Sequence, residues 1–176
     1  TDNLSSSSLS CFIKFRVELI DENDNKPEFS MSNFVTTQIK ENSQFGTPLK
    51  QNIISAFDLD SKLNGAMRYS ILPNKNEHVF RIEPKSGLIL LNTSHLDRET
   101  YGSWVNLTIR AEDLGFKHLY HDTNLSIQII DINDNKPYFD SLEYYFSIEE
   151  NLQPGFVITT LRATDLDSNS QIEYYL

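Results

Sequence analysis

The chain has 176 residues, of which 39% are hydrophobic and 11% aromatic, enough for a globular core. No run approaches the roughly 20 apolar residues of a membrane-spanning helix, and the single cysteine excludes an internal disulfide framework. The net charge of −10 argues against a nucleic-acid-binding role, which requires a basic face.

Predicted strands follow one another along the chain, each marked by apolar residues that alternate with polar ones. The first covers residues 15–19. Cys11, just before it, is expected to be a small buried hydrophobe on a strand or to pair with a cysteine outside this chain. Further strands are predicted at residues 35–39, 53–57, 67–72, 79–82, 88–91, 105–111, 125–129, 144–148 and 157–163, with a tight turn at 84–87. No segment keeps helical spacing of its apolar residues long enough for a helix.

An acidic segment occurs twice and sets the predicted domain organisation. DENDNKPEF at residues 21–29 returns as DINDNKPYF at residues 131–139, 110 residues later, and this period predicts small units in series. If each segment closes one unit, residues 1–25 end a first unit, 26–135 form a complete second one, and 136–176 open a third. About seven short strands in the middle unit predict an all-β sandwich with Greek-key connections. The third unit is expected to be poorly stable by itself.

Each acidic segment has the composition of a cation site. It places two aspartates and two asparagines within five residues, shortly before a proline. Because proline lacks an amide hydrogen and biases the preceding residue towards an extended conformation, the segment presents its oxygens in a fixed row. Carboxylate, amide and carbonyl oxygens are the ligands of a hard cation such as calcium. Unneutralised carboxylates about 4 Å apart would repel each other by roughly 1 kcal/mol per pair even in water.

Other acidic motifs surround the two segments. They are Asp58-Leu59-Asp60 and Asp165-Leu166-Asp167, each with an asparagine shortly after, Glu41-Asn42 and Glu150-Asn151, Leu96-Asp97-Arg98-Glu99, and Ala111-Glu112-Asp113-Leu114-Gly115. In this order and spacing, the motifs resemble those of cadherin extracellular repeats, over essentially the whole chain. The resemblance implies tandem seven-stranded, immunoglobulin-like Greek-key sandwiches, one complete and two partial, with Ca²⁺ bound between successive repeats.

Carried onto this sequence residue by residue, the resemblance implies two calcium-binding junctions. The second junction would use Glu41, Asp97, Glu99, Asp131, Asn133, Asp134, Asp165 and Asp167, with the carbonyls of Ile132 and Asn135, for up to three ions. The first junction would use Asp21, Asn23, Asp24, Asp58, Asp60 and Asp113, with the carbonyls of Asn25 and Asn64, and only its lowest site has a full set. Asn169 departs from the pattern, because it follows Asp167 by two residues whereas Asn64 follows Asp60 by four.

The resemblance also implies a function. It implies calcium-dependent cell adhesion or recognition without catalysis, on the extracellular side of the plasma membrane, in a protein that is membrane-anchored at full length. This stretch itself would not contact the membrane. The partners would be other cadherin-type ectodomains, of the same or a related protein on a neighbouring cell. Four N-glycosylation sequons, at Asn3, Asn92, Asn106 and Asn124, favour the same setting.

Of two other interpretations of the acids, one is rejected and one is disfavoured. An EF-hand requires glycine at position six and glutamate at position twelve, where the first copy has Lys26 and Ser32. The second copy has Lys136 and Leu142 at these positions. A glycosidase could use a carboxylate pair such as that in the Leu96–Glu99 motif, but an active site is not normally duplicated at every domain boundary.

A third reading, a calcium-dependent carbohydrate-binding sandwich, stays open from the sequence. Exposed aromatic side chains would then line a sugar site, and four tyrosines are available for this role: Tyr101, Tyr120, Tyr144 and Tyr145. Packing or pairing of these tyrosines across strands is the competing interpretation.

Overall fold

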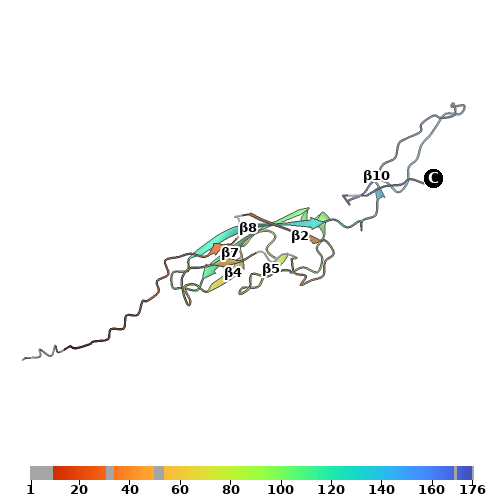
Figure 1. Ribbon diagram of the computed structural model, residues 1–176. Coiled ribbons are helices and arrows are strands. Elements are labelled where there is room, and N and C mark those ends of the chain that lie inside the picture. The colour runs from red at the N-terminus through yellow and green to blue at the C-terminus, as the bar shows by residue number, and fades with distance from the viewer. Residues whose placement is uncertain (1–9, 31–33, 50–53, 169, 176) are drawn as a thin grey trace, which may run out of the picture.

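The computed structural model describes residues 10–30, 34–49, 54–168 and 170–175. An elongated central body is joined to an extended segment at one end and to a long open loop at the other (Figure 1). The elements are β1 (Glu28–Phe29), β2 (Phe34–Lys40), β3 (Ala56–Phe57), β4 (Met67–Ile71), β5 (Phe80–Ile82), β6 (Ile89–Leu91), α1 (Arg98–Tyr101), β7 (Trp104–Asp113), β8 (Tyr120–Ile130), β9 (Tyr138–Phe139) and β10 (Ala163–Thr164).

The main layer is a four-stranded sheet in the order β2-β8-β7-β4. The long strands β7 and β8 pair antiparallel from Trp104 opposite Gln128 to Glu112 opposite Tyr120. Strand β2 runs parallel to β8, although the two are far apart in sequence. This non-consecutive pairing brings the end of β2 beside the end of β8, where the second acidic linker begins.

Smaller pairs, β5–β6 and β1–β3, complete the body. The β5–β6 hairpin confirms the predicted turn at residues 84–87, since the amide of Glu83 donates to the carbonyl of Leu88 at 2.8 Å. Gly87 has a φ of +72°, and a Cβ there would lie 2.7 Å from the carbonyl oxygen of Ile54. Only glycine fits this turn without strain.

The core lies between the layers and follows the predicted alternation. The inward residues of β7 and β8 and their partners across the body are buried: Val105, Leu107, Ile109, Ala111, Leu125, Ile127, Ile129, Val79, Phe80, Leu91 and Leu96. The all-β class is therefore confirmed. The described part of residues 28–130 contains eight strands, against about seven predicted, because the short strand β1 precedes the predicted strand at residues 35–39.

The terminal strands were predicted wrongly. Residues 15–19 form no ladder with any described segment, and Phe15 is 82% exposed. Cys11 is also exposed, against the expectation of burial. A strand needs a neighbour to pair its backbone groups, and alternation alone does not supply one. Similarly, residues 144–148 and most of 157–163 lie outside strands, with only Ala163 and Thr164 of β10 pairing with β9.

Two smaller differences concern residues 53–57 and 98–101. The strand predicted at 53–57 shortens to Ala56–Phe57, with residue 53 outside the described ranges. The helix α1 was not predicted. It has four residues, which is too short to give an apolar periodicity.

The cross-strand pair of Arg110 and Asp122 gives a prediction for pH. The Arg110 guanidinium donates to both carboxylate oxygens at 2.8 and 2.9 Å and lies over the Tyr120 ring. These hydrogen bonds hold the pKa of Asp122 below its usual value. The pair therefore stabilises the fold above the unfolded pKa of about 3.9, and this stability is lost as the pH falls through the lower folded pKa.

Asp122→Asn should lower the free energy of unfolding at pH 7 by about 0.5–1 kcal/mol. In urea denaturation the difference in unfolding free energy from the parent should vanish as the pH falls through the lowered pKa of Asp122. Glu112→Gln, which breaks a more exposed pair with Arg68, should have a smaller effect. If the parent and Asp122→Asn differed in unfolding free energy by the same amount at neutral and acidic pH, the stabilisation would not be ionic in origin.

Candidate metal centres

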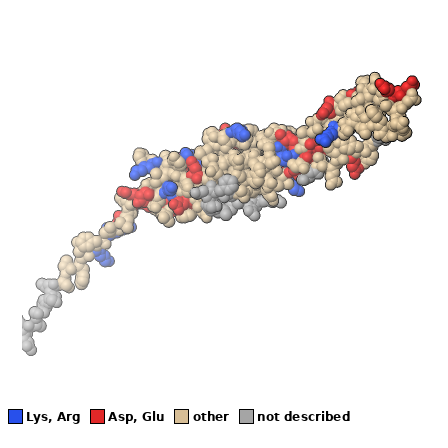
Figure 2. All heavy atoms as spheres, turned by 90° about the horizontal axis from the view of Figure 1, so that it is seen from above, with Lys and Arg blue, Asp and Glu red and all other residues tan. Residues whose placement is uncertain are grey.

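Acidic side chains gather at both ends of the central body, where the extended segments join it (Figure 2). We call these places the first junction, around residues 21–25, and the second junction, around residues 131–135.

Glu41 connects three parts of the second junction. It follows the last residue of β2 and is only 1% exposed. One carboxylate oxygen accepts the Ile132 amide at 2.6 Å and the other accepts the Arg98 amide at 2.9 Å. Glu41 thus joins the end of β2, the start of α1 and the linker after β8.

The short helix α1 brings two more carboxylates to Glu41. Asp97 occupies the N-cap position and Glu99 lies in the first turn. Oxygens of Glu41, Asp97 and Glu99 lie within 4.8 Å of one another. The Thr100 hydroxyl donates to Asp97, and this hydrogen bond lowers the pKa of Asp97.

Glu99 belongs to a second group as well. Its carboxylate also lies within 4.8 Å of those of Asp134 and Asp167. One oxygen of Glu99 is buried without a hydrogen-bond partner among the described residues. Burial raises the pKa of Glu99, and the carboxyl groups of Asp97 and Glu41 raise it further. A bound cation could be coordinated by such an oxygen.

The linker is tied to the segment that follows it. The backbone and side-chain nitrogens of Asn135 donate to Asp167 at 3.0 and 2.7 Å. The Ser168 amide donates to Asp131 at 3.0 Å, and the Asp167 amide donates to Asp165 at 2.9 Å. These bonds hold the aspartates of the second junction in place.

Arg98 lies within the second junction, although the sequence motifs gave it no role there. Its guanidinium contacts the carboxylates of Asp131 and Glu99 and donates to the carbonyl of Leu166 at 2.8 Å. It therefore links α1 directly to the segment beyond the linker. The sequence feature that could have indicated this role is the position of Arg98 between Asp97 and Glu99, which places a positively charged side chain inside an acidic motif. Asn42, with a φ of +57°, was also missed, and it donates to Asp134.

The first junction repeats the same hydrogen-bonded framework. Asn25 donates to Asp60 through its backbone and side-chain nitrogens, at 3.0 and 2.5 Å. The Ser61 amide donates to Asp21 at 3.2 Å, and the Asp60 amide donates to Asp58 at 2.9 Å. Each bond has a counterpart of the same kind at the second junction.

Asp113, at the end of β7, completes the first junction. It is fully buried and accepts the amides of Gly115 and Leu119, both at 2.9 Å, and the Asn23 side chain at 3.2 Å. Burial raises the pKa of Asp58, and the charges of Asp60 and Asp113 raise it further. One oxygen of Asp58 and the side-chain oxygen of Asn23 are buried without partners among the described residues.

Some predicted ligands are not brought together. Across residues 10–30 and 54–168, the carboxylates of the first junction form no group of three within 4.8 Å. Amide groups lie among them, as where the Asn64 side chain donates to Asp21 at 2.9 Å. Asp24 accepts the side chain of Asn25 at 2.8 Å. Asn133 is exposed, and Asn169 lies outside the described residues.

Gly115 allows the first junction to close. A Cβ at this position would lie 2.5 Å from the side-chain nitrogen of Asn23 and 2.6 Å from the side-chain oxygen of Asn64. Gly115→Ala should therefore push Asn23 away from Asp113. Amide exchange at Asn25 should then speed up about 5- to 10-fold, for roughly 1 kcal/mol of lost hydrogen bonding. Asn135 provides the internal control and should not change. Unchanged exchange at Asn25 would show that the Gly115 contact does not hold the junction.

The sequence of this chain is similar to sequences of known proteins. The family model described as Cadherin domain matches residues 35–130, more than half of the chain. The chain belongs to the cadherin family. It is 34% identical to Protein dachsous of Drosophila melanogaster over 96% of its length, which is 5% of that relative. It is 36% identical to Protocadherin Fat 4 of Mus musculus over 90% of its length, which is 3% of that relative.

A solved cadherin structure has the same fold. Human CDH23 EC21-23 superposes with a TM-score of 0.70 at 33% identity, covering 86% of this cadherin chain and 49% of that structure. Among the described residues, no helix is both long and apolar enough to cross a bilayer.

Proposed function

We propose that this cadherin chain binds calcium at both junctions and thereby holds successive repeats in a rigid rod for adhesion or recognition between cells. The repeats would divide at residues 1–25, 26–135 and 136–176. The observation that supports the proposal is the recurrence of one acidic framework at both ends of the sandwich. Each copy has a buried carboxylate oxygen without a hydrogen-bond partner in the part of the chain that the structure describes.

The side chains at both junctions suit calcium. Carboxylates dominate the inward-facing groups, as a hard cation requires, while the amide nitrogens of Asn25 and Asn135 and the Arg98 guanidinium hold some of these carboxylates in place. Glu41, Asp97, Glu99, Asp134 and Asp167 would hold the ion or ions at the second junction, and Asn23, Asp58, Asp60 and Asp113 at the first. The bound ions would supply the positive charge that offsets carboxylate repulsion.

The protein's own residues set the geometry that calcium would stiffen. The side-chain amide of Asn135 donates a hydrogen bond to Asp167 across the linker, and the Arg98 guanidinium donates one to the carbonyl of Leu166 beyond it. Without a cation, repulsion among the surrounding acids opposes these contacts. A stiff rod would present distant surfaces to ectodomains of the same or a related protein on a neighbouring cell. The setting would be the extracellular side of the plasma membrane, in a membrane-anchored protein.

Small-angle scattering of the chain with calcium and with chelator tests the proposal. The parent should become longer and stiffer in millimolar calcium. Asp134→Ala should lose most of this change, while Asp140→Ala, at an exposed aspartate outside the acidic groups, should keep it. Equal scattering by parent and Asp134→Ala at millimolar calcium would refute the proposed role of the second junction.

The carbohydrate-binding alternative would need the four tyrosines to line one site. Three of them contact other side chains separately, and the fourth, Tyr145, is 86% exposed with its hydroxyl donating to Glu143. Tyr101 packs against the core and His78, Tyr120 lies under Arg110, and Tyr144 stacks on Phe146.

A further inference from the structure

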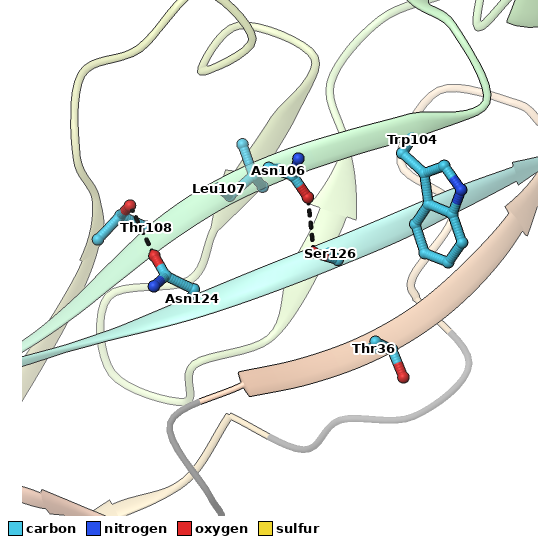
Figure 3. Close-up of a pocket in the computed structure, with 7 residues that line it drawn as sticks. All are labelled: Thr36, Trp104, Asn106, Leu107, Thr108, Asn124 and Ser126. Atoms are coloured by element: carbon cyan, nitrogen blue, oxygen red, sulfur yellow. Dashed lines mark hydrogen bonds between the residues drawn. The ribbon is translucent and has the colours of Figure 1, made fainter.

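Two sequons contact each other on the outer face of the four-stranded sheet. Asn106 and Thr108 of β7 lie opposite Ser126 and Asn124 of β8. The Ser126 hydroxyl donates to the side-chain oxygen of Asn106 at 2.6 Å (Figure 3). The Thr108 hydroxyl donates to that of Asn124 at 3.1 Å. The hydroxyl of each sequon thus fixes the amide group of the other.

These contacts leave the amide nitrogen of Asn106 directed away from Ser126 (Figure 3). Asn106 is exposed, and within the described ranges its Nδ2 donates to no protein acceptor. The Nδ2 of Asn92, in another sequon, instead donates to the carbonyl of His78 at 3.0 Å. A substituent on Asn106 Nδ2 would therefore displace no hydrogen bond of the folded sheet.

An aromatic surface lies beside Asn106. Trp104 is 49% exposed and precedes Asn106 by two residues, which puts both on the same side of β7, about 7 Å apart along the strand. Both line an open groove of about 580 Å³. The residue two before Asn124 is Asp122, which is bound to Arg110. Of the two sequons, only that of Asn106 has an exposed ring two residues before the asparagine, since Tyr120, four residues before Asn124, lies under Arg110.

We propose that Asn106 carries an N-linked glycan whose first N-acetylglucosamine packs on Trp104. Asn106 Nδ2 attacks C1 of an oligosaccharide carried on a lipid diphosphate. The C1–N bond forms, the C1–O bond to the diphosphate breaks, the lipid diphosphate leaves with the bonding electrons, and Nδ2 releases one proton. The apolar face of the sugar then covers the half-exposed indole, as apolar groups cover exposed aromatic surface.

Transfer takes place on the newly made chain, because in the folded sheet the Thr108 hydroxyl is engaged by Asn124. The proposal depends on passage through the secretory pathway, as does the extracellular location proposed above. Calcium binding of unglycosylated protein is measured independently, so failure of one proposal leaves the other intact.

The test is a thermal double-mutant cycle on the chain secreted from mammalian cells, with occupancy read by mass spectrometry of glycopeptides. The four proteins are the parent, Asn106→Gln, Trp104→Ala and the double variant. Asn106 should be occupied in most parent and Trp104→Ala molecules. Asn106→Gln should lower the unfolding midpoint by about 2–4 °C when Trp104 is present, and by much less when Trp104→Ala is present.

The same four proteins made in bacteria, which attach no such glycan, are the matched control and should show no coupling between the two positions. An unoccupied Asn106 in secreted parent would overturn the proposal. So would an equal effect of Asn106→Gln with and without the tryptophan, because the glycan would then not rest on Trp104.

Discussion

Glu99→Gln should weaken calcium binding at the second junction by about 10- to 100-fold or more, since even removal of a group that only supports a metal ligand has an effect of that size. Glu99 is the carboxylate shared by both acidic groups of this junction, and one of its oxygens has no other partner among the described residues. The substitution keeps the shape of the side chain and removes its charge. Equilibrium dialysis against radioactive calcium measures the loss.

Glu83→Gln is the matched control, because it removes the same charge from an exposed pair with Arg81 on β5 and its turn. It should leave binding unchanged. If Glu99→Gln bound as much calcium as Glu83→Gln, with the same affinity, Glu99 would not be a ligand and the assignment of the second junction would be wrong.

Glu41→Ala should lower the free energy of unfolding by about 3 kcal/mol, even without calcium. The buried carboxylate accepts two backbone amides, and each hydrogen bond to a charged group contributes roughly 1.5–3 kcal/mol. Their loss leaves the amides of Arg98 and Ile132 without acceptors. Relief of repulsion with Glu99 offsets part of this effect. Urea denaturation in chelator separates the structural role from metal binding.

An exposed glutamate provides the comparison for this experiment. Glu77→Ala, at an exposed loop position, should change the stability by no more than about 0.5 kcal/mol. Should Glu41→Ala remain within the same range as Glu77→Ala, the hydrogen bonds of Glu41 would not stabilise the junction.

The central sandwich was largely predictable, because its strands have one buried face and alternation records that face directly. Residues 105–111 and 125–129 lie in β7 and β8 as expected. Residues 15–19 show the same alternation without forming a strand. Alternation states which side chains could share a face, whereas ladder formation depends on a neighbouring strand, which lies elsewhere in the sequence.

The candidate site was predictable as a set of acids and not as a set of contacts. The cadherin resemblance implied that the carbonyls of Asn25 and Asn135 are ligands, and the structure adds the hydrogen bonds that their side-chain amides donate to Asp60 and Asp167. The bridging role of Arg98 depends on α1, which is too short to leave a periodic signal. The need for Gly115 arises from a side chain more than 90 residues away, Asn23. No pattern of neighbouring residues in the sequence predicts a contact between residues so far apart.

Titration calorimetry of the 176-residue chain with calcium tests the account most directly. Saturable uptake with a dissociation constant of about 1 mM or lower is predicted, with most of the heat lost in Glu99→Gln and kept in Glu83→Gln. No calcium uptake by the parent chain at concentrations up to about ten times that value would contradict the central claim that the two acidic junctions are cation sites.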